Sequence, residues 1–144
     1  MTDPYDLERF VSAQDAGGAY ERAVGELLRG RKATHWMWFI FPQVAGLGHS
    51  SMSEKFAIAS LAEAKAYLAH PVLGPRLRHC AALVAGSPAS DATAMFGQID
   101  AVKLRSSMTL FLRAAPDEPT WSAVLDRYFG GMTDPATDRQ LGLA

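Results

Sequence analysis

The stretch AVKLRSSMTLFLRA, residues 101–114, decides the fold class of this chain. Its apolar residues Leu104, Met108 and Phe111 recur at intervals of four and three, so they share one face of an α-helix. Asp100 directly precedes the stretch and is expected to cap the helix, because a carboxylate can accept hydrogen bonds from the free amides of a first turn. A helix with one apolar stripe must pack that stripe against other elements of the same chain.

The segments on either side also show helical signals. Residues 19–29, 75–85 and 120–129 each place apolar side chains at helical spacing, and a glycine follows each of them. No stretch alternates apolar and polar residues over the length of a strand. We therefore predict an all-α fold, a single compact domain over residues 1–144 with about seven or eight short helices. Shorter helices are expected after the capping residues Asp3, Ser60, Asp91 and Asp134, and from about Ser53.

The exception to this pattern is WMWFIFP, residues 36–42, which is aromatic and has no periodicity. The segment is compatible with a buried strand or a buried helical turn. A strand without a partner would leave its backbone amides and carbonyls unpaired, and the chain offers no second strand. We therefore expect a short helix or a turn here.

The composition excludes several classes of protein. The chain is 49% apolar, so it can fold around a core, and its one cysteine leaves no pair for a disulfide. Its formal net charge of -1 argues against binding to nucleic acid or an anionic membrane through bulk positive charge. Its longest apolar run, Trp36 to Phe41, is far shorter than the roughly 20 residues that cross a bilayer. The sequence predicts a cytoplasmic protein with no membrane partner, disfavours nucleic acid and leaves a protein partner open.

Two strings of unusual composition identify a resemblance. HWMWFIFPQ (residues 35–43) and KLRSSMTLF (residues 103–111) resemble marker strings of a family of small uncharacterised bacterial proteins, a domain of unknown function, and the resemblance extends over nearly the whole chain. It implies an all-helical single domain and no established activity. Some members of the family are labelled calpastatin, a protease inhibitor with disordered, polar repeats, but this chain has the composition of a packed domain without repeats. Where the family more commonly has tyrosine, this chain has Phe56.

The first string and the residues before it place cations and an imidazole beside indoles. Lys32 could bind phosphate, and Trp36 and Trp38 could stack on a nucleobase or hold a cation. Large aromatic residues are more often simply core, and that reading stays open for both tryptophans. His35 has a side chain whose ordinary pKa lies near neutrality, which suits acid–base chemistry as well as a structural hydrogen bond.

The second string adds a cation and hydroxyl groups. Lys103 and Ser107 are four residues apart and can touch on a helix, while Ser106 lies towards the opposite flank. The spacings of the four histidines and the single cysteine match no metal motif, so neither a metal nor a cofactor is expected. The candidate catalytic residues are His35 and Lys103, and the candidate ligand-binding residues are Lys32, His35, Trp36, Trp38, Gln43, Lys103, Ser106 and Ser107.

These residues favour a protein that binds a small anionic molecule, phosphate-bearing or nucleotide-like. If the protein is an enzyme, which the sequence leaves open, the predicted chemistry is hydrolysis or transfer, with His35 as acid or base and Lys103 neutralising charge. The alternative is a non-enzymatic interaction module in which Trp36, Trp38 or Trp121 anchors a protein partner. Choosing between them depends on whether the two strings meet in space.

Overall fold

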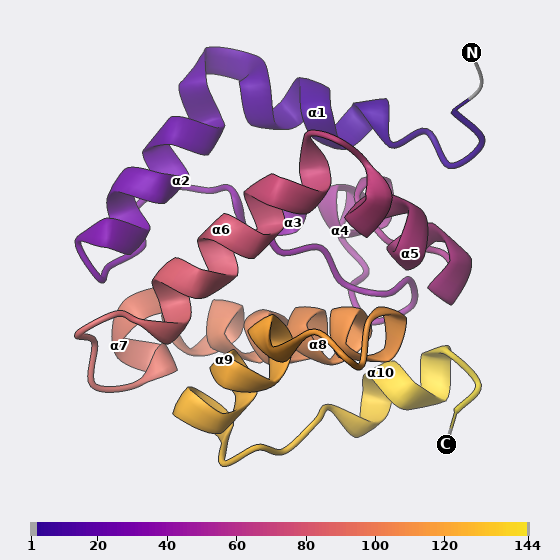
Figure 1. Cartoon of the computed structure of the whole chain (residues 1–144). Coiled ribbons are helices and arrows are strands. Elements are labelled where there is room, and N and C mark those ends of the chain that lie inside the picture. The colour runs from indigo at the N-terminus through magenta and orange to yellow at the C-terminus, as the bar shows by residue number, and fades with distance from the viewer. Residues whose placement is uncertain (1–2, 144) are drawn as a thin grey trace.

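The computed structural model describes residues 3–143, and over these residues the fold is all-helical (Figure 1). The predicted fold class is confirmed. Within residues 3–143 there are ten α-helices, a few more than the predicted seven or eight, and α3 and α4 are only four and five residues long. The helices are α1 (Glu8–Asp15), α2 (Ala19–Leu28), α3 (Met37–Ile40), α4 (Ser51–Lys55), α5 (Leu61–Ala69), α6 (Leu73–Ala85), α7 (Ala92–Phe96), α8 (Gln98–Ala114), α9 (Pro119–Phe129) and α10 (Pro135–Gln140), and a short 3-10 turn, η1 (Ala16–Gly18), joins α1 to α2.

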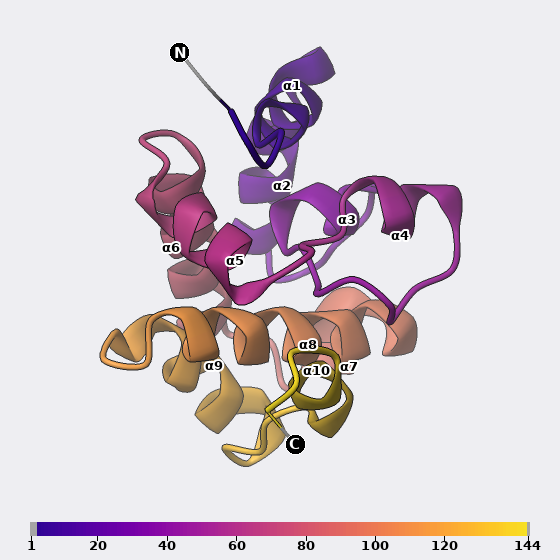
Figure 2. The same ribbon diagram turned by 90° about the vertical axis from the view of Figure 1, so that its right-hand side faces the viewer.

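Helix α8 lies at the centre of the molecule and contacts α5, α7, α9 and α10. Figure 2 shows it running between α1 to α6 on one side and α9 and α10 on the other. The predicted stripe of Leu104, Met108 and Phe111 is completely buried, as a central helix requires. Ser107 and Leu110 are buried as well, so α8 is enclosed around more of its circumference than the stripe alone indicates.

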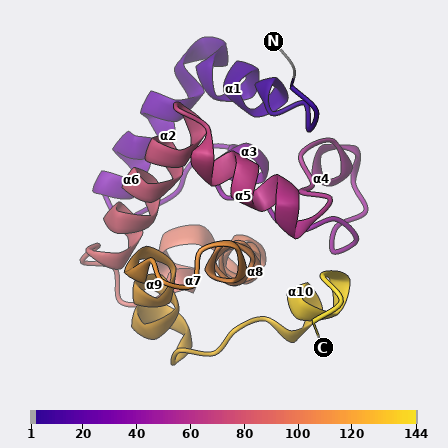
Figure 3. The ribbon, with the colours of Figure 1, turned by 45° about the vertical axis from the view of Figure 1, so that its right-hand side comes forward.

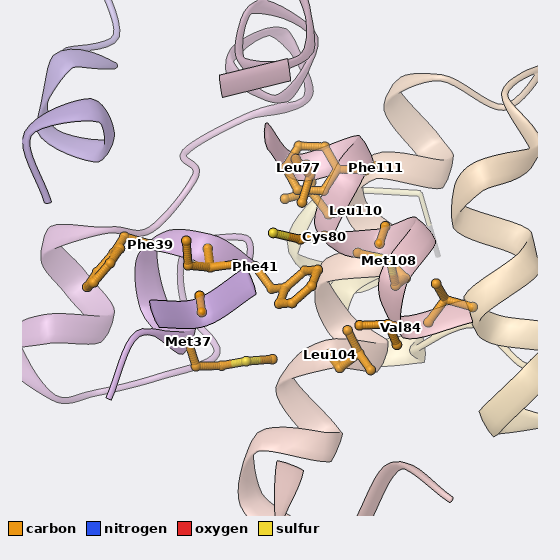
Figure 4. Close-up of a cluster of buried hydrophobic side chains, with 14 of the residues drawn as sticks. Met37, Phe39, Phe41, Leu77, Cys80, Val84, Leu104, Met108, Leu110 and Phe111 are labelled. Atoms are coloured by element: carbon orange, nitrogen blue, oxygen red, sulfur yellow. The ribbon is translucent and has the colours of Figure 1, made fainter. Parts of the chain in front are cut away.

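The core joins α8 to the aromatic segment around α3. Phe41 points from the end of α3 towards Leu104 and Met108 of α8 (Figure 4). Trp36 and Phe41 lie with ring centroids 6.3 Å apart. Burying an aromatic side chain removes a large apolar area from water, so this packing fixes α3 against α8. The expectation of a short helix rather than a strand in residues 36–42 is confirmed.

Most of the predicted helix starts are confirmed by their hydrogen bonds. The side chains of Ser60, Asp91 and Asp134 each accept from the backbone amide three residues further along. The prediction for Asp100 was wrong: α8 begins at Gln98, three residues before the predicted start at Ala101, and it follows Gly97, whose φ of 81° favours glycine. Asp100 therefore lies inside the first turn of α8, where its carboxylate is free to pair with side chains.

Helix α1 also begins later than expected. It starts at Glu8, not directly after Asp3, because a turn at Pro4 and Tyr5 intervenes. Asp3 still serves this helix: its carboxylate accepts from the amides of Leu7 and Glu8 at 2.8 and 3.0 Å.

After α3 the chain turns through residues 41–50 towards α8 and α10. A parallel bridge pairs Val44 in this loop with Ile58, which follows α4, and so ties the loop to the segment after that helix. The amide of Ala45 donates to the carbonyl of Ile58 at 2.8 Å, and the amide of Ile58 donates to the carbonyl of Gln43 at 2.9 Å. Figure 3 shows α10 on the same side of the molecule as this loop and α4. Residues 41–50, α8 and α10 are thus brought together although they are far apart in the sequence.

Candidate functional site

Two lysines from the two marker regions share one carboxylate. Lys32 Nζ lies 3.0 Å from Asp100 Oδ2, and Lys103 Nζ lies 3.6 Å from Asp100 Oδ1. The side chain of Lys32 is only 8% exposed, and its ammonium also donates to the carbonyl of Thr34 at 2.6 Å. Because two ammonium groups face one carboxylate, this group of three charges has a net positive charge. The longer distance leaves Lys103 as the less compensated cation.

Each of these lysines also lies over an indole ring. Lys32 Nζ is 5.1 Å from a ring centroid of Trp36, and Lys103 Nζ is 5.3 Å from a ring centroid of Trp38. Both distances fall within the roughly 6 Å over which a cation is attracted to an aromatic face. The two strings singled out in the sequence therefore meet in space, and Lys103 and Trp38 are where they do so.

The loop before α3 is fixed by a buried carboxylate. Glu26 Oε1 accepts from the amides of Ala33 and Thr34 at 2.6 and 2.9 Å and from Trp36 Nε1 at 2.9 Å, and Glu26 Oε2 accepts from Thr34 Oγ1 at 2.6 Å. Burial by itself would raise the pKa of Glu26, but these four hydrogen bonds outweigh it and lower the pKa to about 2. Glu26 thus holds residues 33–36 in place and with them the position of Lys32.

Two neighbouring cavities open beside Lys103. The smaller, of about 150 Å³, lies between α3, α4 and α8 and has Trp38, Phe56 and Glu54 in its wall. The larger, of about 420 Å³, lies between the 41–50 loop, α8 and the start of α10. Gln43, Gly48 and Lys103 line both cavities, so the two are adjacent, and we call them together the Lys103 cleft.

Two glycines shape the loop wall of the cleft. Gly46 has a φ of 95°, which disfavours other residues, and a side chain there would collide with Gln140 of α10. A Cβ atom on Gly48 would come within 2.5 Å of Ser53 Oγ. The absence of a side chain at both positions lets the loop lie close to α10 and α4, which sets the width of the cleft.

A carboxylate at the far end of the cleft is already hydrogen-bonded within the protein. Asp134 Oδ2 accepts from Ser106 Oγ at 2.8 Å and from Thr137 Oγ1 at 2.7 Å. Burial acts to raise the pKa of Asp134, but the hydrogen bonds from Thr137 and Ser106 outweigh it and lower the pKa. Asp134 is therefore negatively charged at neutral pH and repels anions at this end of the cleft.

The structure brings four of the predicted ligand-binding residues together. Trp38, Gln43, Lys103 and Ser106 line the cleft, and Lys32 is connected to it through Asp100. Sequence reasoning did not assign a binding role to Asp100, Glu54 or Asp134. Asp100 lies three residues before Lys103, a spacing that allows an ion pair on one helix, and this signal could have found it. Glu54 and Asp134 reach the site from other segments, so no local signal points to them.

The other three predicted residues lie elsewhere. His35 is exposed and lines neither cavity. Trp36 is buried in the core, and its Nε1 donates a hydrogen bond to Glu26. Ser107 is completely buried, and its hydroxyl has no hydrogen-bond partner within the described residues. Trp38 Nε1 is also shielded without a partner there, but Trp121 Nε1 is in the same state far from the cleft, so this feature does not distinguish the site.

Neither a metal-binding cluster nor a membrane-spanning helix is found in the part of the chain that the structure describes. Within residues 3–143, no three His, Cys, Asp or Glu side chains gather in an arrangement that could hold a metal ion. Over the same residues, every helix is too short or too polar to traverse a lipid bilayer.

The fold and the cleft together define a class: an all-helical domain with one lysine-centred cleft between its central helix and a loop. Residues 4–141 match the family described as "Protein of unknown function (DUF1810)", and the chain belongs to this family. The resemblance stated from the two strings is thus confirmed at the level of a domain of unknown function. Comparison with curated proteins gives no match.

A solved structure shares this fold closely. The crystal structure of the conserved hypothetical protein Rv1873 from Mycobacterium tuberculosis superposes with a TM-score of 0.94 at 46% sequence identity. The alignment covers 99% of this chain and 100% of that one. Neither this description nor that of the family names a ligand or an activity.

Proposed function

We propose that this protein binds a small anionic molecule, phosphate-bearing or nucleotide-like, in the Lys103 cleft. The observation that supports the proposal most directly is the sharing of Asp100 by two lysines. Lys32 makes the shorter pair with Asp100, so the ammonium of Lys103 retains charge that an incoming anion can neutralise. The side chain of Lys103 is 22% exposed, so a ligand in the cleft can reach it.

The surrounding residues suit a ligand with a planar or polar part. Trp38 contributes an indole to the smaller cavity, and aromatic faces stack on nucleobases and other flat rings. Gln43 lines both cavities, and its amide can donate to and accept from a ligand. An anion at Lys103 would therefore be flanked by one stacking group and one hydrogen-bonding group.

The proposal concerns binding, and a chemical step would need an acid or base at the ligand. The hydrolysis or transfer predicted from the sequence used His35 in that role, but His35 lines neither cavity. The titratable side chains in the wall of the smaller cavity are Glu54 and Lys103. A reaction in the cleft would thus have to use these groups, or Asp134 of the larger cavity, rather than His35.

The alternative, a protein-interaction module, required exposed indoles as anchors. Trp36 and Trp121 are buried in the core, and Trp38 is half-buried in the wall of the cleft. A small molecule fits this arrangement better than a tryptophan-anchored protein partner, because the accessible part of the indole faces a cavity and not a flat surface.

Binding is tested by NMR titration of the protein with inorganic phosphate, adenosine monophosphate and ribose 5-phosphate. We expect chemical-shift changes to cluster at the Trp38 indole, Gln43 and Lys103. Lys103→Gln should weaken binding about tenfold, because it removes a charged hydrogen-bond donor. Lys65→Gln, a change of an exposed lysine on α5, is the matched control and should have no effect. Shifts clustered elsewhere, or equal affinities of wild type and Lys103→Gln, would contradict the proposal.

A further inference from the structure

The two parts of the cleft differ in chemistry. Lys103 stands at their junction, since it lines both cavities. The larger cavity is walled mainly by apolar side chains, namely Leu47, Ile99, Val102 and Ala136. These come from the 41–50 loop, α8 and α10, so three separate segments converge to build one apolar surface next to a cation.

Two of these side chains are unusually accessible. Ile99 is 74% exposed and Val102 is 61% exposed, and they lie three residues apart on the same face of α8. Single exposed apolar residues are common on protein surfaces. Here the two lie beside each other and beside Leu47, at the mouth of a cavity, and a grouped apolar surface of this kind is typical of a binding site.

Beyond Gln43 and Lys103, which face both cavities, the polar side chains of the larger cavity are Ser106 and Asp134, and these two are already hydrogen-bonded within the protein. Ser106 donates to Asp134, and Asp134 in turn accepts from Thr137, so these groups satisfy one another. The charge of Asp134 would repel a negative group that approached this end of the cleft. The cleft therefore presents one site for negative charge, at Lys103, followed by a surface that favours apolar atoms.

We infer that the ligand of the Lys103 cleft is an amphipathic molecule with one anionic group, a carboxylate or a phosphate, at Lys103 and an apolar body over Leu47, Ile99 and Val102. This inference rests on the proposed function and narrows its ligand class. It excludes compounds with a negative group at each end, because the second negative group would lie beside the carboxylate of Asp134.

A series of straight-chain acids tests the apolar part. Acetate, butanoate, hexanoate and octanoate are titrated against the protein, with binding followed by NMR at Lys103 and Val102. The affinity should rise by up to about fourfold for each methylene group that enters the cavity, as expected for the removal of that group from water. Octyl phosphate in place of octanoate shows which anionic group Lys103 prefers.

One further ligand and one double variant test the arrangement. Suberate, which also has eight carbons but a carboxylate at each end, should bind at least tenfold more weakly than octanoate. Ile99→Ser combined with Val102→Ser should flatten the dependence on chain length while the affinity for acetate stays unchanged. Leu28→Ser, at an equally exposed leucine on α2, is the control. Because all three positions are exposed, circular dichroism should show unchanged folding.

The outcomes separate the two proposals. If acetate and phosphate bind at Lys103 but the affinity does not change with chain length, the amphipathic ligand is refuted and the anion site stands. If octanol binds as tightly as octanoate and Lys103→Gln has no effect, the anion site itself is refuted. If Ile99→Ser converts a dimer to a monomer in sedimentation velocity, the apolar surface belongs to a second copy of this chain and the inference is overturned.

Discussion

The stability of the protein should fall in acid because the loop before α3 is held by the ionised carboxylate of Glu26. The pKa of Glu26 is about 2 in the folded protein, against an ordinary value of 4.5. A carboxyl whose pKa is lowered by folding stabilises the protein above its unfolded pKa and loses this contribution as the pH falls towards the folded pKa. The difference corresponds to about 3 kcal/mol of stability, present at neutral pH and lost between about pH 4.5 and pH 2.

The substitution Glu26→Gln isolates this contribution. Its amide keeps the shape of the side chain but has no charge, so the hydrogen bonds from Ala33, Thr34 and Trp36 become weaker. At pH 6 the variant should be less stable than the wild type by about 2–3 kcal/mol. This gap should largely close as the pH falls to 2, because the stability that the ionised carboxylate contributes is nearly all lost once the pH reaches the folded pKa.

Urea denaturation followed by circular dichroism at pH 6, 5, 4, 3 and 2 measures the gap. Glu21→Gln, at an exposed position of the same helix, is the control and should follow the wild type. A constant difference between wild type and Glu26→Gln across this range would refute the reasoning, because the carboxylate would then not be the source of the acid sensitivity.

Three further predictions concern buried positions. Ser107→Ala should leave the free energy of unfolding unchanged or raise it by up to about 1 kcal/mol, because the buried hydroxyl has no hydrogen-bond partner within the described residues. A clearly lower melting temperature in thermal denaturation would disprove this. Burial raises the pKa of the Cys80 thiol to about 12, so the native protein should resist iodoacetamide at pH 8, and fast alkylation without unfolding would contradict that. Gly74→Ala should cost about 2–3 kcal/mol, because its Cβ would collide with the carbonyl oxygen of Leu68, whereas Gly86→Ala should be mild in the same denaturation assay.

The helices could be predicted because their signals are local. Apolar spacing and a following glycine locate α9, and the hydroxyl of Ser60 locates the start of α5. The start of α8 could not be predicted in this way. Asp100 has the residue type of a capping group, but its carboxylate pairs with Lys32, which lies 68 residues earlier in the chain. A long-range ion pair leaves no trace in the local pattern.

The candidate site could be predicted only where a polar residue stands inside an unusual string. Lys103 and Trp38 were found in this way and lie in the cleft. The direction of each side chain could not be read from the string, because residues 36–42 have no periodicity. His35 is consequently exposed on the outside, while its neighbour Trp36 is buried against Glu26.

The walls of the cleft come from residues 37–57, 99–106 and 134–136, three stretches separated by long intervals of sequence. During translation, the first two stretches are synthesised before α10. The large cavity then lacks the side of its wall that contains Asp134 and Ala136, and Gln140 is not yet beside Gly46. A ligand can therefore bind fully only to the finished domain, and its binding will stabilise the whole domain rather than any folding intermediate that precedes it.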